Sequence, residues 1–364
     1  MRTNRVVLLL LGLLVGCGPE GTTPTGYRAP EALPEASLPV VVLDTQRTDL
    51  LLGAAFGQLA QVPPRTIAEA LNWHQRTLKG KADEFLRLLA FDPEAGLVSD
   101  SLVADQYAAF GLNRAVRDLF DSVAQRYPAG YPLFAQFEAP LRRYKAAFPG
   151  AAVPKLRTYI TGYQKPGPVT MDPYLAATLT DTTAYLGIGL HYFMGPKFGP
   201  YPDDIPKYIL RRCTPEHLLP GALLKLMELH LPPAPQEGRE PLLSHMIRMG
   251  IHYYSLDVLA PDMPDSLKIG YTSTQTRFAE AYLKNIWNEL LPELYDGELL
   301  KYRRWLDEAP YTRGLSQESP PRLGAYVGWQ IVRSYMRRHP EMGLAELLRA
   351  NRYEAILRDS GFRP

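Results

Sequence analysis

The sequence has few cysteines, almost no excess charge and, past its N-terminus, no long apolar run. Only two of its 364 residues are cysteine, at positions 17 and 213, so a disulfide-stapled scaffold is excluded. Lysine and arginine number 40 against 38 aspartates and glutamates, and so small a net charge argues against a nucleic-acid partner. No apolar run after the first 16 residues approaches the roughly eighteen residues of a transmembrane helix, so we expect none in the body.

Familiar catalytic motifs are absent as well. The chain has no Gly-x-Ser-x-Gly elbow, phosphate-binding loop or dinucleotide fingerprint. None of the seven histidines lies four residues from another, so no helix presents two imidazoles to one metal ion. His245 and His252 would share a helix face, but their α-carbons would lie about 10 Å apart, too far for a compact site. The sequence therefore predicts no catalytic residues, no metal and no cofactor other than a covalent lipid.

The N-terminus carries a short export signal that ends in a cysteine. Arg2 and Arg5 precede the apolar run Val6–Val15, which as a helix would span about 15 Å, roughly half of a bilayer core. The ending Leu-Val-Gly-Cys resembles the lipobox of bacterial lipoproteins, in which the cysteine thiol accepts a diacylglycerol. We therefore predict a signal peptide over residues 1–16 and lipidation of Cys17; an ordinary secretory signal is the alternative. Cys213 is then expected to be a buried, inert thiol.

The remainder divides into a tether and one body. Residues 17–38 are rich in proline and glycine and poor in apolar side chains, which is typical of a flexible tether. Residues 39–364 are expected to form an α+β domain, predominantly α-helical, with one small sheet. The expected strands are 39–44, 156–161 and 184–190. The expected helices lie between 50 and 144, and at 220–230 (preceded by one turn capped by Thr214), 242–259, 272–290 (opened by a capping box of Thr272 and Gln275) and from 319 onward.

Several side chains are candidates for a binding site. Glu216 lies near a helix start, where the macrodipole explains an acidic residue and a general-base role is the alternative. Arg322 is badly placed for the dipole of the helix that follows, so we expect it to have a carboxylate partner, in a structural ion pair or as a substrate clamp. Gly324 and Gly328 each cost about 1 kcal/mol relative to alanine inside a helix. We expect a closely packed helix to offset this cost, or a ligand approached by the backbone.

Seven segments resemble the family of the gliding motility lipoprotein GldB, and the likeness extends over roughly residues 40–360. They are Val153–Lys155, Tyr159–Gly162, Tyr185–Leu190, Tyr208–Glu216, Pro264–Tyr271, Ser319–Gly324 and Gly328–Tyr335. The resemblance implies a cell-envelope lipoprotein needed for surface gliding, a motility linked to a dedicated secretion machine. Its partners would be membrane lipid, through the anchor, and other envelope proteins of gliding and secretion. Gly18, rather than aspartate, follows Cys17, which favours the outer membrane, facing the periplasm.

A weaker similarity connects the order of strands and helices with zinc peptidases of the His-Glu-x-x-His type. In those enzymes one helix supplies two histidines and a base, and the next supplies a third ligand, often in Glu-Gly. Here the first helix offers Pro215, Glu216 and Leu219, or Ala222, Leu223 and Leu226 in a shifted register. The second has Met249-Gly250 in place of Glu-Gly. The similarity thus implies a degenerate, peptidase-like scaffold with its metal ligands lost.

Three functions are compatible with these observations. The first is a non-catalytic, membrane-tethered interaction protein of the gliding and secretion apparatus. The second is an envelope hydrolase with an atypical site, which requires at least three of Glu216, His217, His245 and His252 to converge. The third is a peptide- or glycan-binding lipoprotein, which would be favoured by a pocket lined by aromatic side chains. These are Tyr185, Tyr253, Tyr254 and Trp329, for which burial in the core is the alternative.

Overall fold

The computed structural model describes residues 35–81, 84–85, 99–161 and 173–364. Cys17 and the signal peptide lie outside these residues, so the predicted anchor is not described. The described part is mostly helical with one small four-stranded sheet, which confirms the predicted α+β class. No helix among the described residues is both long and apolar enough to cross a membrane.

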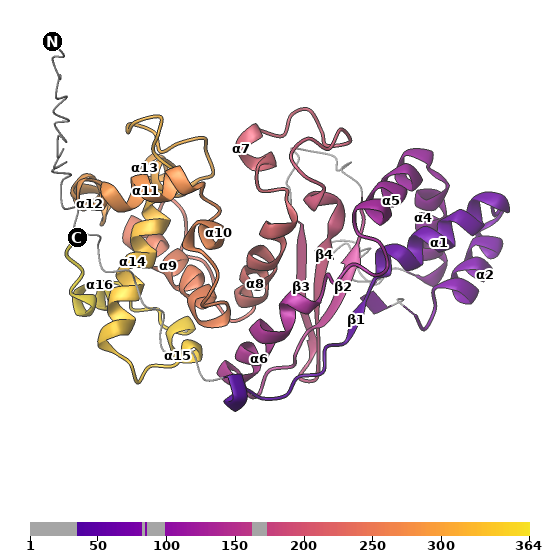
Figure 1. Ribbon diagram of the computed structural model, residues 1–364, viewed down its shortest axis with the longest axis horizontal. Helices are drawn as coiled ribbons and strands as arrows, with labels where there is room; N and C mark the ends of the chain where they lie inside the picture. Colours follow the sequence, from indigo (N-terminus) through magenta and orange to yellow (C-terminus); the bar gives the residue numbers. More distant parts are fainter. Residues whose placement is uncertain (1–34, 82–83, 86–98, 162–172) are drawn as a thin grey trace, which may run out of the picture.

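The sheet is mixed and stands near the middle of the molecule (Figure 1). Its strand order is β1-β2-β4-β3: β1 pairs with β2 and β2 with β4 in parallel, whereas β3 pairs antiparallel with β4 along the opposite edge. β3 and β4 are joined by a tight turn, and their register shifts between Thr178 and Thr180. The bounds are β1 (Thr45–Gln46), β2 (Lys155–Tyr159), β3 (Tyr174–Thr180) and β4 (Thr183–Gly189).

Four of the N-terminal helices, α1, α2, α4 and α5, gather at one end of the molecule, beyond β1 and β2, whereas α6 lies on the other side of the sheet (Figure 1). Local sequence explains where several of them begin. The Thr66 hydroxyl accepts a hydrogen bond from the Glu69 N–H at the start of α2, and the Asn113 side chain accepts from the first turn of α5. The bounds are α1 (Thr48–Gln61), α2 (Ile67–Thr77), α4 (Asp100–Leu112), α5 (Arg114–Arg126) and α6 (Glu138–Ala147).

The C-terminal helices form the opposite end, with α8 between them and the sheet (Figure 1). The expected capping box is present: the Thr272 hydroxyl accepts from the Gln275 N–H, and the Gln275 side chain accepts from the Thr272 N–H. The bounds are α7 (Lys207–Leu210), α8 (Leu218–Glu228), α9 (Leu242–Leu259), α10 (Asp265–Ile269), α11 (Ser273–Ala281), α12 (Leu283–Leu290), α13 (Leu299–Leu306), α14 (Leu323–Arg338), α15 (Leu344–Leu348) and α16 (Tyr353–Ser360). Short 3₁₀ turns are η1 (Glu35–Ser37), η2 (Ala135–Phe137), η3 (Leu190–Phe193), η4 (Pro215–His217) and η5 (Leu291–Glu293).

Helices α9 and α14 cross with their backbones in contact, and glycines make this possible. A Cβ added to Gly328 would lie 1.9 Å from the Met246 carbonyl oxygen, and one added to Gly250 would lie 2.3 Å from the Gly328 carbonyl oxygen. Gly324 is closed in by Trp305 and Leu306. The glycines of α14 are therefore explained by close packing, the first of the two expected reasons. Gly250 is needed in α9 for the same crossing.

Other predicted elements differ from the structure in instructive ways. The strand expected at 39–44 is wrong: pairing is limited to β1, and Val40 and Val42 are each 90% exposed. The helix expected over 272–290 is divided at Tyr282, whose backbone (φ −105°, ψ 15°) leaves the helical region. The helix expected from residue 319 begins only at Leu323, because two prolines and a left-handed residue, Arg322, precede it.

The remaining predicted elements agree with the structure. The strands expected at 156–161 and 184–190 correspond to β2 and β4, and the helix expected at 242–259 is α9. A 3₁₀ turn with Thr214 at its N-cap and Pro215 at its first position precedes α8, as expected, although α8 begins two residues earlier than 220.

Candidate functional site

The structure brings together two of the five binding candidates and leaves the other three apart. His217 and Arg322 line one cavity of about 220 Å³, which Glu216, His245 and His252 do not line. The walls of the cavity come from segments far apart in the sequence: β3, η3, α7 and the turn after it, η4, α8, α9, α10 and the residue before α14. Its lining is Pro173, Tyr174, Tyr192, Phe193, Ile209, Arg212, Cys213, His217, Pro220, Gly221, Leu224, Tyr253, Leu267, Lys268, Ile269, Gly270 and Arg322.

Arg322 is held in the cavity wall by an unusual backbone. Its φ of 55° is the only positive φ of a non-glycine residue in the described ranges. The side chain is buried; Nη1 donates to the Tyr253 hydroxyl and Nη2 to the Ile269 carbonyl, both at 2.5 Å. Its Nε lies 3.1 Å from Oε1 of Glu308. Arg322 thus has a carboxylate neighbour and at the same time faces the cavity.

Arg212 and Arg322 lie next to the same carboxylate. Nη1 of Arg212 donates to Glu308 Oε1 at 2.8 Å, the oxygen that also lies beside Arg322. Burial works to raise the pKa of Glu308, but the charges of Arg322 and Arg212 outweigh it and lower the pKa, so this carboxylate stays ionised. The pKa of the neighbouring Arg211 is lowered by burial and by repulsion from Arg212 and Arg322. Three guanidinium groups, of Arg211, Arg212 and Arg322, therefore interact electrostatically with one carboxylate, that of Glu308.

His217 and Glu216 lie on the η4 turn but play different parts. Nδ1 of His217 is 2.9 Å from the Thr214 hydroxyl, and burial, followed by repulsion from Arg212, lowers its pKa to about 4. The imidazole is therefore neutral at pH 7. Glu216 is exposed, and its pKa is lowered chiefly by a hydrogen bond from the Thr214 side chain. A carboxylate with a lowered pKa is a weak general base.

The two histidines of α9 are bound into the core. Nε2 of His252 lies 2.7 Å from the Leu224 carbonyl oxygen of α8, and the His245 ring packs edge-on against Tyr302, 4.7 Å between centroids. Burial lowers the pKa of both, so they are neutral at pH 7. Neither joins His217 in a shared site.

The aromatic side chains expected around a binding pocket are divided between the cavity and the core. Tyr253 lines the cavity. Tyr254 and Trp329 are buried among core residues, and Tyr185 belongs to a separate cluster with Phe85. All four side chains are therefore buried, and Tyr253 belongs to the core and lines the cavity as well.

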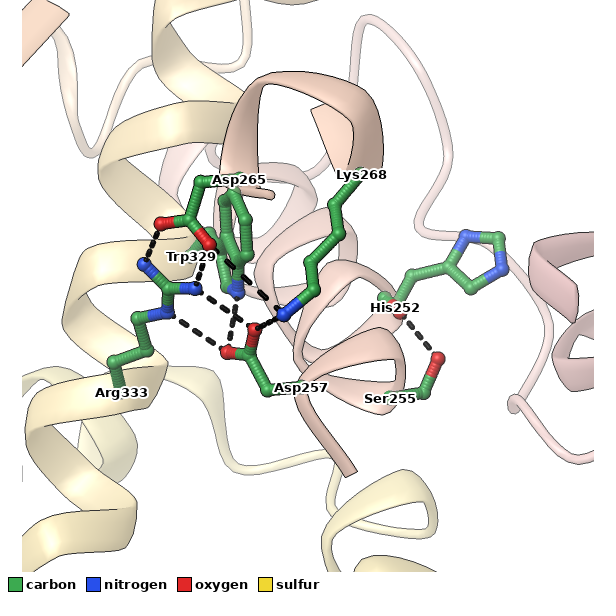
Figure 2. A network of polar contacts seen from close by, with 7 residues as sticks. All are labelled: His252, Ser255, Asp257, Asp265, Lys268, Trp329 and Arg333. Atoms are coloured by element: carbon green, nitrogen blue, oxygen red, sulfur yellow. Dashed lines mark hydrogen bonds and ion pairs between the residues drawn. The ribbon is translucent and has the colours of Figure 1, made fainter. Parts of the chain in front are cut away.

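A second charged cluster is buried beside the cavity, and its residues were not predicted as a site from the sequence. Asp257 of α9 is fully buried; it accepts from Lys268 Nζ at 2.8 Å, from Arg333 at 2.8 Å and from the Trp329 indole at 3.0 Å (Figure 2). Arg333 also donates to Asp265 of α10 (Figure 2). Two cations face two carboxylates, so the cluster is neutral and joins α9, α10 and α14. An aspartate between Leu256 and Val258, near the apolar end of α9, is the signal that could have revealed it, since a buried charge needs partners.

Arg212 and Glu308 were also missed by sequence reasoning. Residues 212 and 308 meet only through the tertiary fold, and no motif or spacing connects them. Within the described part of the chain, no three His, Cys, Asp or Glu side chains are grouped so as to hold a metal ion.

Comparison with known proteins gives one match. The family model described as gliding motility protein GldB matches residues 65–364, which include strands β2, β3 and β4, the cavity and the buried charge cluster. Comparisons with curated proteins and with solved structures gave no match. Since the matched residues are most of the chain, the chain belongs to the gliding motility protein GldB family.

Proposed function

We propose that this protein is a lipid-anchored component of the cell envelope that serves gliding motility and its associated secretion apparatus by binding other proteins, without catalysis. The observation that carries the proposal is the family match over residues 65–364. Cys17, at the end of the lipobox-like segment, is the proposed lipid attachment site, and the outer membrane, facing the periplasm, is the proposed location. No cofactor other than the lipid and no nucleic-acid partner is part of the proposal.

The chemistry of the candidate side chains supports a non-catalytic role. The histidines at 217, 245 and 252 are neutral at pH 7 and are engaged with a hydroxyl, an aromatic ring and a backbone carbonyl. Glu216 is exposed and does not line the cavity with His217. A hydrolase of the kind considered above needs at least three of these groups around one reacting atom, and the described geometry does not bring them together.

A clean deletion of the gene in its own organism tests this function. The expected result is loss of colony spreading and of secretion by the associated apparatus, restored by the wild-type gene supplied in trans. A deletion strain that spreads and secretes like its parent would refute the proposal.

The third possible function, ligand binding, is supported by a separate observation, the cavity. Its walls combine aromatic and aliphatic side chains with two guanidinium groups. A binding protein of the envelope could use such a cavity alongside its interactions with other proteins.

A further inference from the structure

We infer that the cavity beside Arg322 binds a carboxylate together with the apolar group attached to it, which is about as large as one amino-acid side chain. The inference goes beyond the proposed function and does not depend on it, because it rests on the charges and walls of the cavity alone.

The charge of the cavity wall favours an anion. Arg212 and Arg322 line the cavity with two positive charges, and Glu308, which lies 2.8 Å from the first and 3.1 Å from the second, is the carboxylate paired with both. This leaves an excess of one positive charge. Lys268 adds nothing to it, because Asp257 neutralises it at 2.8 Å. A site with excess guanidinium charge selects an anion.

Two guanidinium groups of the cavity wall have N–H groups left over for a ligand. A guanidinium has five N–H groups. Arg322 uses one on Nη1 and one on Nη2, so each terminal nitrogen has a further N–H with no acceptor in the described part of the chain. Arg212 donates only from Nη1, to Glu308, within the same residues. These donors can bind a carboxylate in the paired geometry for which arginine is suited.

Arg322 is positioned for this contact at a cost in backbone energy. A left-handed conformation is unfavourable for an arginine, and such outliers cluster at functional sites. The Tyr253 and Ile269 oxygens fix the guanidinium in the cavity wall. Gly270 keeps the wall open: a Cβ there would lie 2.9 Å from Arg212 Cδ and 3.7 Å from Arg322 Nη2.

The size and lining of the cavity define the rest of the ligand. A dry cavity of about 150 Å³ can hold benzene, so about 220 Å³ accommodates one aromatic or branched side chain together with its carboxylate. Tyr174, Phe193, Leu224 and Leu267 provide apolar walls for that side chain. The C-terminal residue of a peptide and a free small-molecule carboxylate both have this chemistry.

Calorimetric titration of the detergent-solubilised mature protein tests the inference. The probes are N-acetyl-L-phenylalanine and its carboxamide, which differ only in charge and in the group offered to the arginines. The acid is expected to bind at least about tenfold more tightly than the amide, because a hydrogen bond to a charged group is lost in the latter. Equal binding of acid and amide, or no saturable binding of the acid at millimolar concentration, would overturn the inference.

Two variants with opposite expected effects place the binding in this cavity. Arg212→Gln removes a donor and should weaken binding of the acid about tenfold, whereas Glu308→Gln removes the competing carboxylate and should strengthen it several-fold. Arg349→Gln makes the same charge change at an arginine outside the cavity and should leave binding unchanged. Unchanged affinity in a folded Arg212→Gln protein would refute the site. If a variant does not fold by circular dichroism, the comparison of acid and amide on the unsubstituted protein still decides.

A third arm separates the two sources of the ligand. Hexapeptides that end in phenylalanine, with a free or an amidated C-terminus, are titrated in the same way. Tighter binding of the free-acid peptide than of N-acetyl-L-phenylalanine assigns the site to a chain terminus. Weaker binding of that peptide assigns it to a small-molecule carboxylate. Both results support the carboxylate chemistry, and equal binding of the free and amidated peptides contradicts it.

Discussion

Replacing Gly328 with alanine should destabilise the protein, although alanine is the better helix former. The new methyl carbon would lie 1.9 Å from the Met246 carbonyl oxygen, about 1.5 Å closer than the 3.4 Å at which ordinary contact begins. The clashing atom belongs to the backbone of α9, so it cannot be relieved by a side-chain rotation. The two helices must move apart along a crossing whose neighbouring residues Ile247 and Val332 are fully buried.

The expected size of the effect follows from two opposing contributions. Overpacking of a core costs about 1–3 kcal/mol, and a clash with backbone belongs at the upper end of that range. Alanine recovers about 1 kcal/mol of helix propensity. The net loss is about 2 kcal/mol, which for a protein of this size lowers Tm by roughly 3 °C, because the entropy of unfolding is about 2.1 cal/mol/K per residue.

Thermal unfolding followed by circular dichroism measures this change. Gly57→Ala is the matched control, because Gly57 is an exposed residue of α1 and a Cβ there meets nothing within 4 Å. That variant should gain up to about 1 kcal/mol. A Gly328→Ala protein as stable as the wild type, or stabilised like the control, would refute the close crossing of α9 and α14.

Three further predictions concern the buried charges, the titration of the cavity wall and the anchor. Asp257→Asn leaves the two cations Lys268 and Arg333 to share one carboxylate, Asp265, so that one positive charge in the core is no longer balanced. The free energy of unfolding should fall by about 3–5 kcal/mol in urea titrations, and a loss under about 1 kcal/mol would contradict the network. Burial lowers the pKa of His217 from its usual 6.5 to about 4 in the folded protein, so the unfolded chain binds the extra proton and stability falls as pH drops from 6.5 towards 4. His217→Asn removes the titrating group and should reduce the loss of stability between pH 7 and pH 5 by up to about 2 kcal/mol, measured from unfolding curves at the two pH values. A variant that loses as much stability as the wild type would refute the lowered pKa of His217. Cys17→Ala should abolish palmitate incorporation and release the protein from the membrane fraction, and a variant that still incorporates palmitate would disprove the attachment site.

The sequence was informative wherever a local signal determined the structure. Helix α9 was predicted with its observed bounds because its apolar pattern is long and begins directly after Pro241. The capping box at Thr272 was predicted because it needs only residues three apart. The strand β3 was missed, since it is a partly exposed edge strand without a clear alternation.

Predictions failed where the outcome depended on contacts between distant segments. A β-branched run at 39–44 is typical of a strand, but little of it finds a neighbouring strand to pair with. His217 and Arg322 were predicted individually, whereas their meeting in one cavity, and the contribution of Arg212 and Glu308, depends on how the helices pack. The position of one arginine in the sequence does not predict which charged side chains will lie next to it in the fold.

The central claim is that the protein serves gliding by contact with other proteins and without catalysis. The most direct test is the colony spreading of a deletion strain complemented with the Glu216→Gln variant. Glu216 is the residue that a hydrolase would most need as its base, and it is exposed and outside the cavity, so the variant should fold normally. The account predicts spreading equal to that of the strain complemented with the wild-type gene. Loss of spreading by a strain that contains the folded variant at wild-type abundance would contradict it.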